Sequence, residues 1–181
     1  MATTPYQWLQ ELERRAKQKA KGLPRQEEVK QVWHGIAFRI GEVQLVSPLT
    51  DIHEIYDFAH VAVNLARVPG AKLWVKGLAN HRGVLLPIID LQAYLNGKST
   101  AISNRSRMLI VNQASVYAGL IVDDVLGIKH FYEDSRDIKT PCKETWLTSY
   151  SSGLFKEDKI TWVIFDIKVL AENATFLNAA L

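Results

Sequence analysis

The residues most suggestive of chemistry form the short run Gly97-Lys98-Ser99-Thr100. A glycine followed by Lys-Ser or Lys-Thr ends the phosphate-binding loop of many nucleotide-binding proteins. Such a loop also needs a glycine five residues earlier, so that backbone N–H groups can fold around the phosphate. Position 92 is Gln92, within a segment that fits a helical turn. We therefore predict an ordinary loop at residues 97–100.

Histidine and cysteine residues offer a second kind of chemistry, metal ligation or nucleophilic catalysis. The histidines show none of the short spacings typical of zinc ligands; they are His34, His53, His60, His81 and His130. The single cysteine, Cys142, lies in a polar segment without a nucleophile-elbow pattern. With His130 and Asp123 it would form a hydrolytic set, a hypothesis that no motif supports. We expect no metal ion, no cofactor and no catalytic residue.

The densest group of informative residues follows Gly77. Gly77 and Gly83 permit tight backbone geometry, and Asn80 is a residue type that stabilises turns through its side chain. Arg82 therefore stands at a turn before the apolar strand expected at residues 84–89. An arginine beside an apolar surface is typical of a protein interface. On physical grounds alone, an internal ion pair is an equal alternative.

Short β-rich runs separated by turn residues position these side chains. Alternating apolar residues around Gly41-Glu42 predict a hairpin of residues 35–40 and 43–46. Pro87 indicates that its strand lies at a sheet edge or carries a bulge. Further strands are predicted at residues 52–58, 84–89, 108–111, 117–125, 128–132, 153–155 and 160–165. This spacing, without a long βαβ alternation, is typical of a β-barrel or sandwich.

Helices are expected mainly at the two ends of the chain. Thr4, Pro5 and Gln7 match a helix start, and apolar residues at helical spacing predict an amphipathic helix that ends near Gly22. We expect this helix to dock on the protein's own β-rich body, although its basic face would also suit a lipid surface. Shorter helices are predicted at residues 71–78, at residues 91–95 and after Asp166, which would cap the last one.

Composition and charge exclude several classes of protein. Hydrophobic residues make up 48% of the 181 residues and charged residues 23%, a balance typical of a soluble globular protein. We expect neither a secretory signal nor a membrane span, and the lone cysteine fits a reducing compartment, so the predicted location is the cytoplasm. Residues 1–31 hold seven basic and four acidic side chains, which leaves fifteen of each sign in the remainder. The body is thus neutral, and we expect no nucleic-acid partner.

An ordered series of motifs gives the most specific information. Gly77-x-x-Asn80-x-Arg82-Gly83 is followed by Leu86-Pro87-Ile88-Ile89-Asp90-Leu91, and together they resemble the signature of CheW-like domains. Three further segments resemble strands of that family: Phe38-Arg39-Ile40-Gly41, Ile52-His53-Glu54-Ile55 and Gly119-Leu120-Ile121-Val122-Asp123-Asp124-Val125. The resemblance covers about residues 33–172. Within the family, Trp33-x-Gly35-Ile36, Lys129-His130-Phe131 and the N-terminal helix resemble adaptors of type IV pilus twitching-motility systems.

The resemblance implies a mainly β fold of two intertwined five-stranded SH3-like β-barrels, with an N-terminal amphipathic helix and a short C-terminal helix. It also implies a non-enzymatic adaptor that binds a CheA-type histidine kinase and the cytoplasmic tip of a methyl-accepting chemoreceptor. Any association with membrane arrays would then be indirect, through the receptor. The residues expected to contact these partners are Glu54, Ile55, Asn80, Arg82, Gly83 and Val84.

We divide the chain into an N-terminal helix and linker at residues 1–32, a CheW-like domain of two barrel subdomains at residues 33–172, and a C-terminal tail at residues 173–181. The expected function is to couple receptor and kinase in a pathway that controls twitching motility. Two alternatives stay open: a β-barrel that senses a small ligand, and the cysteine-dependent hydrolase. The 133–152 loop follows no family pattern, so its role is left open.

Overall fold

A computed structural model describes residues 8–11, 13–15, 31–62, 64–113 and 116–178. The contacts divide the chain into two units, Met1–Lys30 and Gln31–Leu181. In the first unit, residues 8–11 and 13–15 are helical, as the amphipathic pattern predicts. The predicted helix start at Thr4 and its end near Gly22 lie outside the described residues. The predicted division at residues 32 and 172 stays a prediction.

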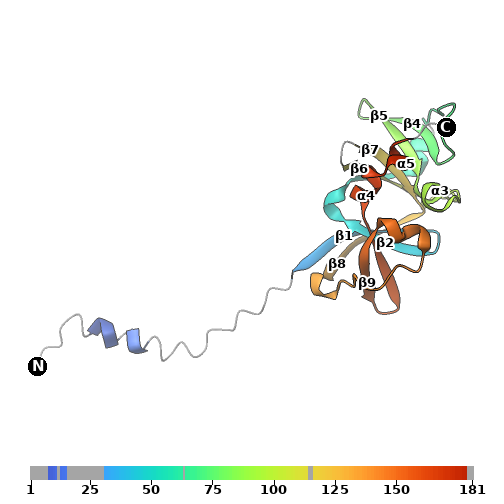
Figure 1. Cartoon of the computed structure of the whole chain (residues 1–181). Helices are drawn as coiled ribbons and strands as arrows, with labels where there is room; N and C mark the ends of the chain where they lie inside the picture. The colour runs from blue at the N-terminus through green and yellow to red at the C-terminus, as the bar shows by residue number, and fades with distance from the viewer. Residues whose placement is uncertain (1–7, 12, 16–30, 63, 114–115, 179–181) are drawn as a thin grey trace, which may run out of the picture. The chain divides into compact units, whose positions relative to one another are not determined.

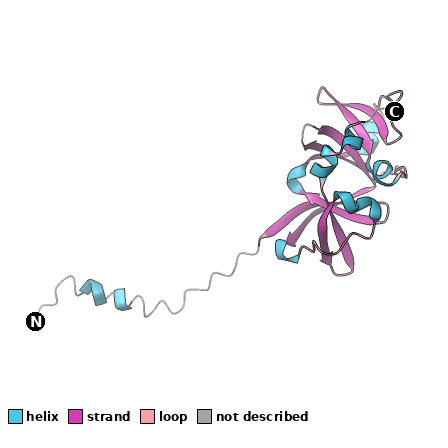
Figure 2. Cartoon of the chain, in the orientation of Figure 1, coloured by secondary structure: helices cyan, strands magenta, loops and turns pink. Residues whose placement is uncertain are grey.

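Strands dominate the second unit (Figure 2). They are β1 (Val32–Ile40), β2 (Val43–Pro48), β3 (Ile52–Asp57), β4 (Val75–His81), β5 (Val84–Asp90), β6 (Arg107–Gln113), β7 (Val116–Val122), β8 (Asp124–Tyr132), β9 (Ser151–Glu157) and β10 (Ile160–Phe165). The α-helices are short: α2 (Phe58–Ala62), α3 (Leu91–Asn96), α4 (Ile167–Glu172) and α5 (Ala174–Leu177). Three 3-10 turns complete the described elements: η1 (Leu49–Asp51), η2 (Glu133–Ser135) and η3 (Thr145–Tyr150).

The strands form two five-stranded sheets, which confirms the predicted fold class (Figure 1). The first sheet has the order β8-β1-β2-β10-β9 and the second the order β3-β6-β7-β5-β4. Each contains a central antiparallel hairpin, β1–β2 or β6–β7, with one parallel neighbour, β10 or β5. The chain starts in the first sheet, builds the whole second sheet and then returns. The two sheets are therefore intertwined and share one strand pattern.

Each sheet is curled so that side chains of its two edge strands meet. In the first sheet, Lys129 of β8 and Glu157 of β9 form an ion pair of 2.7 Å. Beside them, the rings of Phe131 and Phe155 stack with centroids 4.3 Å apart. Trp162 adds to this buried cluster. Aromatic side chains thus fill the interior of the first barrel.

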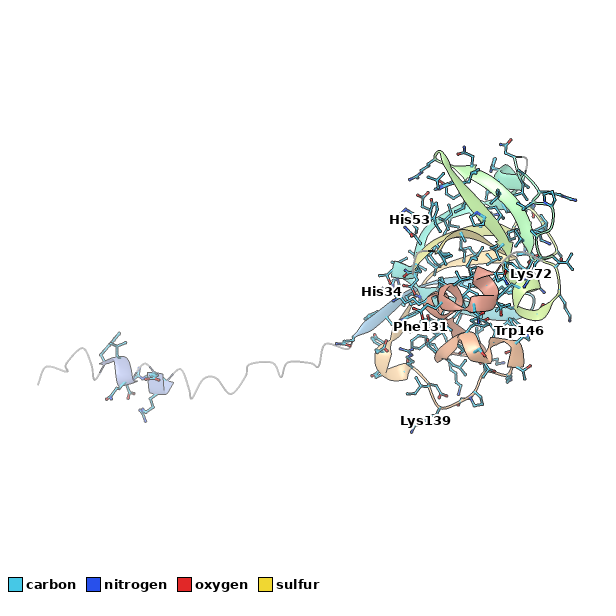
Figure 3. All side chains as sticks on the ribbon, turned by 45° about the horizontal axis from the view of Figure 1, so that its top comes forward. His34, His53, Lys72, Phe131, Lys139 and Trp146 are labelled. Carbon is cyan, nitrogen blue, oxygen red and sulfur yellow. The ribbon has the colours of Figure 1, made fainter. Side chains whose placement is uncertain are left out.

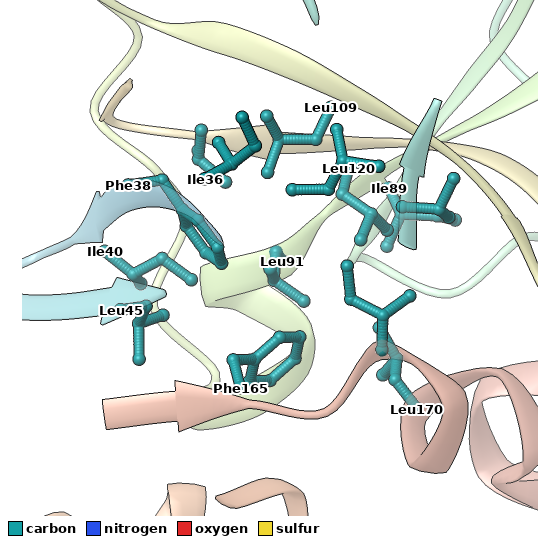
Figure 4. Close-up of a cluster of buried hydrophobic side chains, with 14 of the residues drawn as sticks. Ile36, Phe38, Ile40, Leu45, Ile89, Leu91, Leu109, Leu120, Phe165 and Leu170 are labelled. Carbon is teal, nitrogen blue, oxygen red and sulfur yellow. The ribbon is translucent and has the colours of Figure 1, made fainter. Parts of the chain in front are cut away.

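The largest hydrophobic cluster lies between the two sheets, where it joins them into one body (Figure 4). The first sheet contributes Phe38 and Phe165, and the second contributes Leu109 and Leu120, all fully buried. Helix α4, which follows β10, adds Leu170 to the same cluster. As predicted, Asp166 caps this helix by accepting hydrogen bonds from two backbone N–H groups at its start.

The helix predicted at residues 71–78 is wrong, because residues from Val75 onward form strand β4. β4 pairs along its length with β5, and a bulge lies between Val75 and Gly77. Gly77 has φ +150°, and a Cβ atom there would lie 2.4 Å from the carbonyl oxygen of Ala66. Long-range pairing has therefore overridden a local pattern that fits a helix.

The strand that carries Pro87 is interior, not at the sheet edge, since β5 lies between β7 and β4. Its pairing with β7 begins only at Ile88. Pro87, which has no N–H, therefore pairs with β4 alone, and the bulge lies in β4 and not in β5. Proline cannot donate a backbone hydrogen bond, and at Pro87 none is needed on the β7 side, although the strand is central.

The strand predicted at residues 117–125 is divided at Asp123, where the chain passes from the second sheet to the first. The Asp123 N–H donates to the carbonyl of Arg39, and its carboxylate accepts from the Gly41 N–H. β8 then runs unbroken to Tyr132 and includes the strand predicted at residues 128–132. The short helices α2 and α5 were not predicted, because each is only about one turn long.

Replacing Phe165 by alanine is expected to destabilise the fold by about 3–5 kcal/mol, because Phe165 is fully buried between the sheets and the cavity could not collapse. Urea unfolding measures this loss. A matched control is Leu73→Ala, whose side chain is 91% exposed and whose loss is expected to cost about 0.5 kcal/mol or less. Equal losses for both variants would contradict the assignment of the core.

Candidate functional site

The hairpin between β4 and β5 brings four of the six predicted site residues into one tight turn. His81 and Val84 are the last paired residues, so Arg82 and Gly83 form a two-residue connection. Both have positive φ, +52° and +85°, as the turns that match strand twist require. The Asn80 side-chain oxygen accepts a hydrogen bond of 2.8 Å from the Gly83 N–H. The residue types at positions 80–84 therefore determine the shape of this turn, which is called the tip of the hairpin below.

The turn directs Arg82 onto Glu54, a predicted site residue on β3. Arg82 Nη1 lies 2.9 Å from Glu54 Oε1, and Nη2 lies 3.0 Å from Oε2, which is a bidentate ion pair. β3 and β4 are the two edge strands of the second sheet, so this pair bridges them. The Arg82 side chain is still 68% exposed. It therefore forms the ion pair that was one of the two alternatives for Arg82, while most of its side chain stays exposed.

Tyrosine and histidine side chains form a chain of hydrogen bonds that ends on Glu54 of the ion pair. Tyr56 O–H donates to Glu54 at 2.7 Å and lies 3.1 Å from His81 Nε2. His81 Nδ1 lies 2.6 Å from the hydroxyl of Tyr117. Since the Tyr56 proton is used on Glu54, Tyr56 accepts from His81 Nε2–H, and Nδ1 accepts from Tyr117. In a neutral His81 ring, this chain of hydrogen bonds therefore places the hydrogen on Nε2.

This network shifts the pKa of the carboxyl group it surrounds. The hydrogen bond from Tyr56, followed by the nearby charge of Arg82, lowers the pKa of Glu54 below its ordinary value. The same hydrogen bond raises the pKa of Tyr56. Glu54 therefore stays ionised in neutral solution, where it holds Arg82 in place.

Sequence reasoning missed Tyr56, His81 and Tyr117 as parts of this site. Period-two alternation was the available signal, because Tyr56 lies two residues from Glu54 and must share its face of β3. His81 is 8% exposed and contacts Tyr56 and Tyr117, whereas the side chain of its neighbour Arg82 is 68% exposed. The contact with Tyr117 joins segments far apart in the sequence and has no local signal.

Large apolar side chains surround the charged tip. Val84 is 52% exposed and Leu85 66% exposed, both at the start of β5. The predicted site residue Ile55 is 40% exposed, and its side chain points to the opposite face of β3 from Glu54. The six predicted residues therefore do not form one surface: five lie at the tip and Ile55 lies behind the strand. A fixed arginine next to exposed aliphatic groups is suited to binding protein.

The residues of the hypothetical hydrolytic set each have a different partner. Cys142 Sγ contacts the carboxylate of Glu144 at 3.3 Å, and burial raises the pKa of its thiol. His130 contacts His34, and Asp123 binds the backbone of Gly41. A nucleophile, a base and an orienting carboxylate in mutual contact are therefore not formed by these residues.

The run at residues 97–100 is a loop that follows helix α3. Gly97 ends α3 with φ +75°, and its N–H binds the carbonyl of Ala93. Thr100 donates from both its backbone N–H and its hydroxyl to the buried Asp90, which also caps α3. The loop predicted from the sequence is confirmed.

No helix in the described part of the chain is long and apolar enough to cross a membrane.

Comparison with known proteins shows which family has this architecture. Residues 34–175 match the model of the CheW-like domain. The chain is 37% identical to Protein PilI of Pseudomonas aeruginosa over 98% of its own length and 97% of that protein's. It is 25% identical to the chemotaxis protein CheW of Thermotoga maritima, over 77% of this chain and 88% of that protein.

A solved structure has the same fold. The crystal structure of the scaffolding protein TtCheW from Thermoanaerobacter tengcongensis superposes with a TM-score of 0.69 at 26% sequence identity. The match covers 80% of this chain and 95% of that one. The match of residues 34–175 and the shared fold show that the chain belongs to the CheW-like domain family. The members of this family are non-enzymatic scaffolds of chemosensory signalling.

Proposed function

We propose that this protein couples the cytoplasmic tip of a methyl-accepting chemoreceptor to a CheA-type histidine kinase. Its membership of the CheW-like family supports the coupling role. Similarity to PilI along almost the whole chain supports the narrower proposal that the pathway controls twitching motility by type IV pili. The protein acts in the cytoplasm and reaches membrane arrays only through the receptor.

The observation that carries this proposal is the clamped tip of the β4–β5 hairpin. The Glu54 ion pair and the Asn80 turn hold Arg82 in one place, so little conformational entropy is lost when a partner binds it. Val84 and Leu85 offer apolar area at the same tip. We propose that Glu54, Ile55, Asn80, Arg82, Gly83 and Val84 serve partner binding, with Arg82 and Val84 in direct contact and Glu54, Asn80 and Gly83 shaping the tip.

Arg82→Glu is expected to weaken co-assembly with receptor and kinase by about 1–3 kcal/mol while leaving the body folded, because it reverses the charge of an exposed anchor. Co-sedimentation with receptor-bearing membranes and kinase measures the loss. The matched control is Arg105→Glu, an exposed arginine in the turn before β6, which is expected to co-sediment normally. If Arg82→Glu co-sediments as the unchanged protein does, Arg82 is not part of the docking surface.

Combining Glu54→Arg with Arg82→Glu separates a structural role of the ion pair from a docking role. The exchange restores an ion pair of opposite polarity between β3 and β4, so thermal stability is expected to recover relative to Arg82→Glu alone. Co-sedimentation is expected to stay weak, since a partner that recognises the arginine now meets a glutamate. Recovery of both properties would show that the arginine only holds the hairpin.

A cavity of about 510 Å³ favours small-ligand sensing as a second candidate. It lies between β2, the segment around Cys142 and the β9–β10 hairpin, and its lining includes Gln44, Lys156 and Val163. Its volume is within the range of small-molecule sites. A thermal shift caused by metabolites in the absence of any protein partner would favour this function over coupling.

A further inference from the structure

Two histidines that lie 96 residues apart in the sequence meet on the surface of the first sheet. His34 of β1 and His130 of β8 are directly opposite each other in the antiparallel pair. Their Nδ1 atoms are 2.6 Å apart, and the two rings are nearly perpendicular, with centroids separated by 4.7 Å. Both side chains are exposed to solvent. His34 lies at the margin of the β-rich body (Figure 3).

We propose that His34 and His130 form a two-histidine binding site for a divalent transition-metal ion, with Zn²⁺ as the representative ligand. No group of three or more histidine, cysteine or acidic side chains suited to a metal occurs among the described residues. The site would therefore supply two protein ligands, and water would complete the coordination. It lies outside the proposed docking surface at the β4–β5 tip and does not depend on the proposed function.

The two Nδ1 atoms already face each other across a hydrogen-bond distance. A contact this short between neutral rings needs one proton between the two nitrogens, so one ring carries its hydrogen on Nδ1 and the other on Nε2. When both rings carry their hydrogen on Nε2, both Nδ1 lone pairs are free for a metal. From the neutral pair, this change moves one proton within a single ring by exchange with water.

Small side-chain rotations convert the hydrogen bond into a chelate. Zinc lies about 2.0–2.1 Å from each imidazole nitrogen, so a tetrahedral site separates the two nitrogens by roughly 3.3 Å. The present separation is 2.6 Å, and the two exposed rings need to move apart by less than one ångström. Imidazole nitrogens suit Zn²⁺, Cu²⁺ and Ni²⁺, whereas Mg²⁺ prefers oxygen ligands.

The backbone beneath the site is held rigidly. Trp33 and Phe131 are the neighbouring cross-strand pair, and they point to the opposite face of the sheet. There Trp33 packs against Phe131 with ring centroids 6.1 Å apart and against Phe155 at 5.2 Å. The Cα atoms of the two histidines are therefore fixed before a metal arrives, so binding orders only their side-chain torsions.

Titration calorimetry with Zn²⁺ on the untagged full chain tests the proposal. The unchanged protein is expected to bind one Zn²⁺ per chain with a rise in melting temperature, and Mg²⁺ is expected to have no effect. His34→Gln and His130→Gln are each expected to weaken binding at least about tenfold, or about 1.4 kcal/mol. The control is His60→Gln, an 86%-exposed histidine on α2 that is expected to leave binding unchanged.

Nuclear magnetic resonance of the unchanged protein keeps the test valid if a variant fails to fold. Zn²⁺ is expected to shift the imidazole resonances of His34 and His130 and to leave those of His60 in place. The proposal is overturned if the unchanged protein shows no saturable Zn²⁺ binding. It is equally overturned if both site variants bind as tightly as the unchanged protein, or if the His60 resonances shift in place of the others.

Discussion

Curling of each five-stranded sheet until its edge strands touch is the constraint on which the rest of the molecule depends. Side chains make this contact in both sheets: Lys129 with Glu157 in the first and Glu54 with Arg82 in the second. Once the sheets are curled, their inner faces hold separate small cores and their outer faces share the large one. The arginine at the hairpin tip therefore helps to close the barrel and still exposes 68% of its side chain.

Much of the fold could be predicted from the sequence because many of its elements are determined by residues that lie close together in the chain. Alternation around Gly41-Glu42 predicted the first hairpin, and the residues around Arg82 predicted a turn before strand β5, although not its partner strand β4. Asp166 predicted helix α4. The order of the motifs predicted the family, which the comparisons confirm. Local patterns failed at β4, where Gly77 accommodates a bulge that only its partner strand reveals.

The functional geometry was less accessible, since it depends on contacts between distant segments. The roles left open for Arg82 were interface anchor or ion pair, and only the curl of the second sheet brings Glu54 within reach. His81, to which the sequence assigned no role, proves to be the buried link between Tyr56 and Tyr117. His34 and His130 show no metal-ligand spacing in the sequence, and only the pairing of β1 with β8 makes them neighbours.

The second sheet is continuous in sequence, from β3 to β7, and it interrupts the first. During synthesis on the ribosome, β1 and β2 emerge early but must wait for β8, β9 and β10, whereas the strands of the inserted sheet can assemble as soon as β7 has left the exit tunnel. The parallel contact between β2 and β10, which joins Leu45 to Val163, is then among the last to form. Nascent chains truncated before β8 would expose the unpaired edges of the β1–β2 hairpin, where chaperones or aggregation would act first.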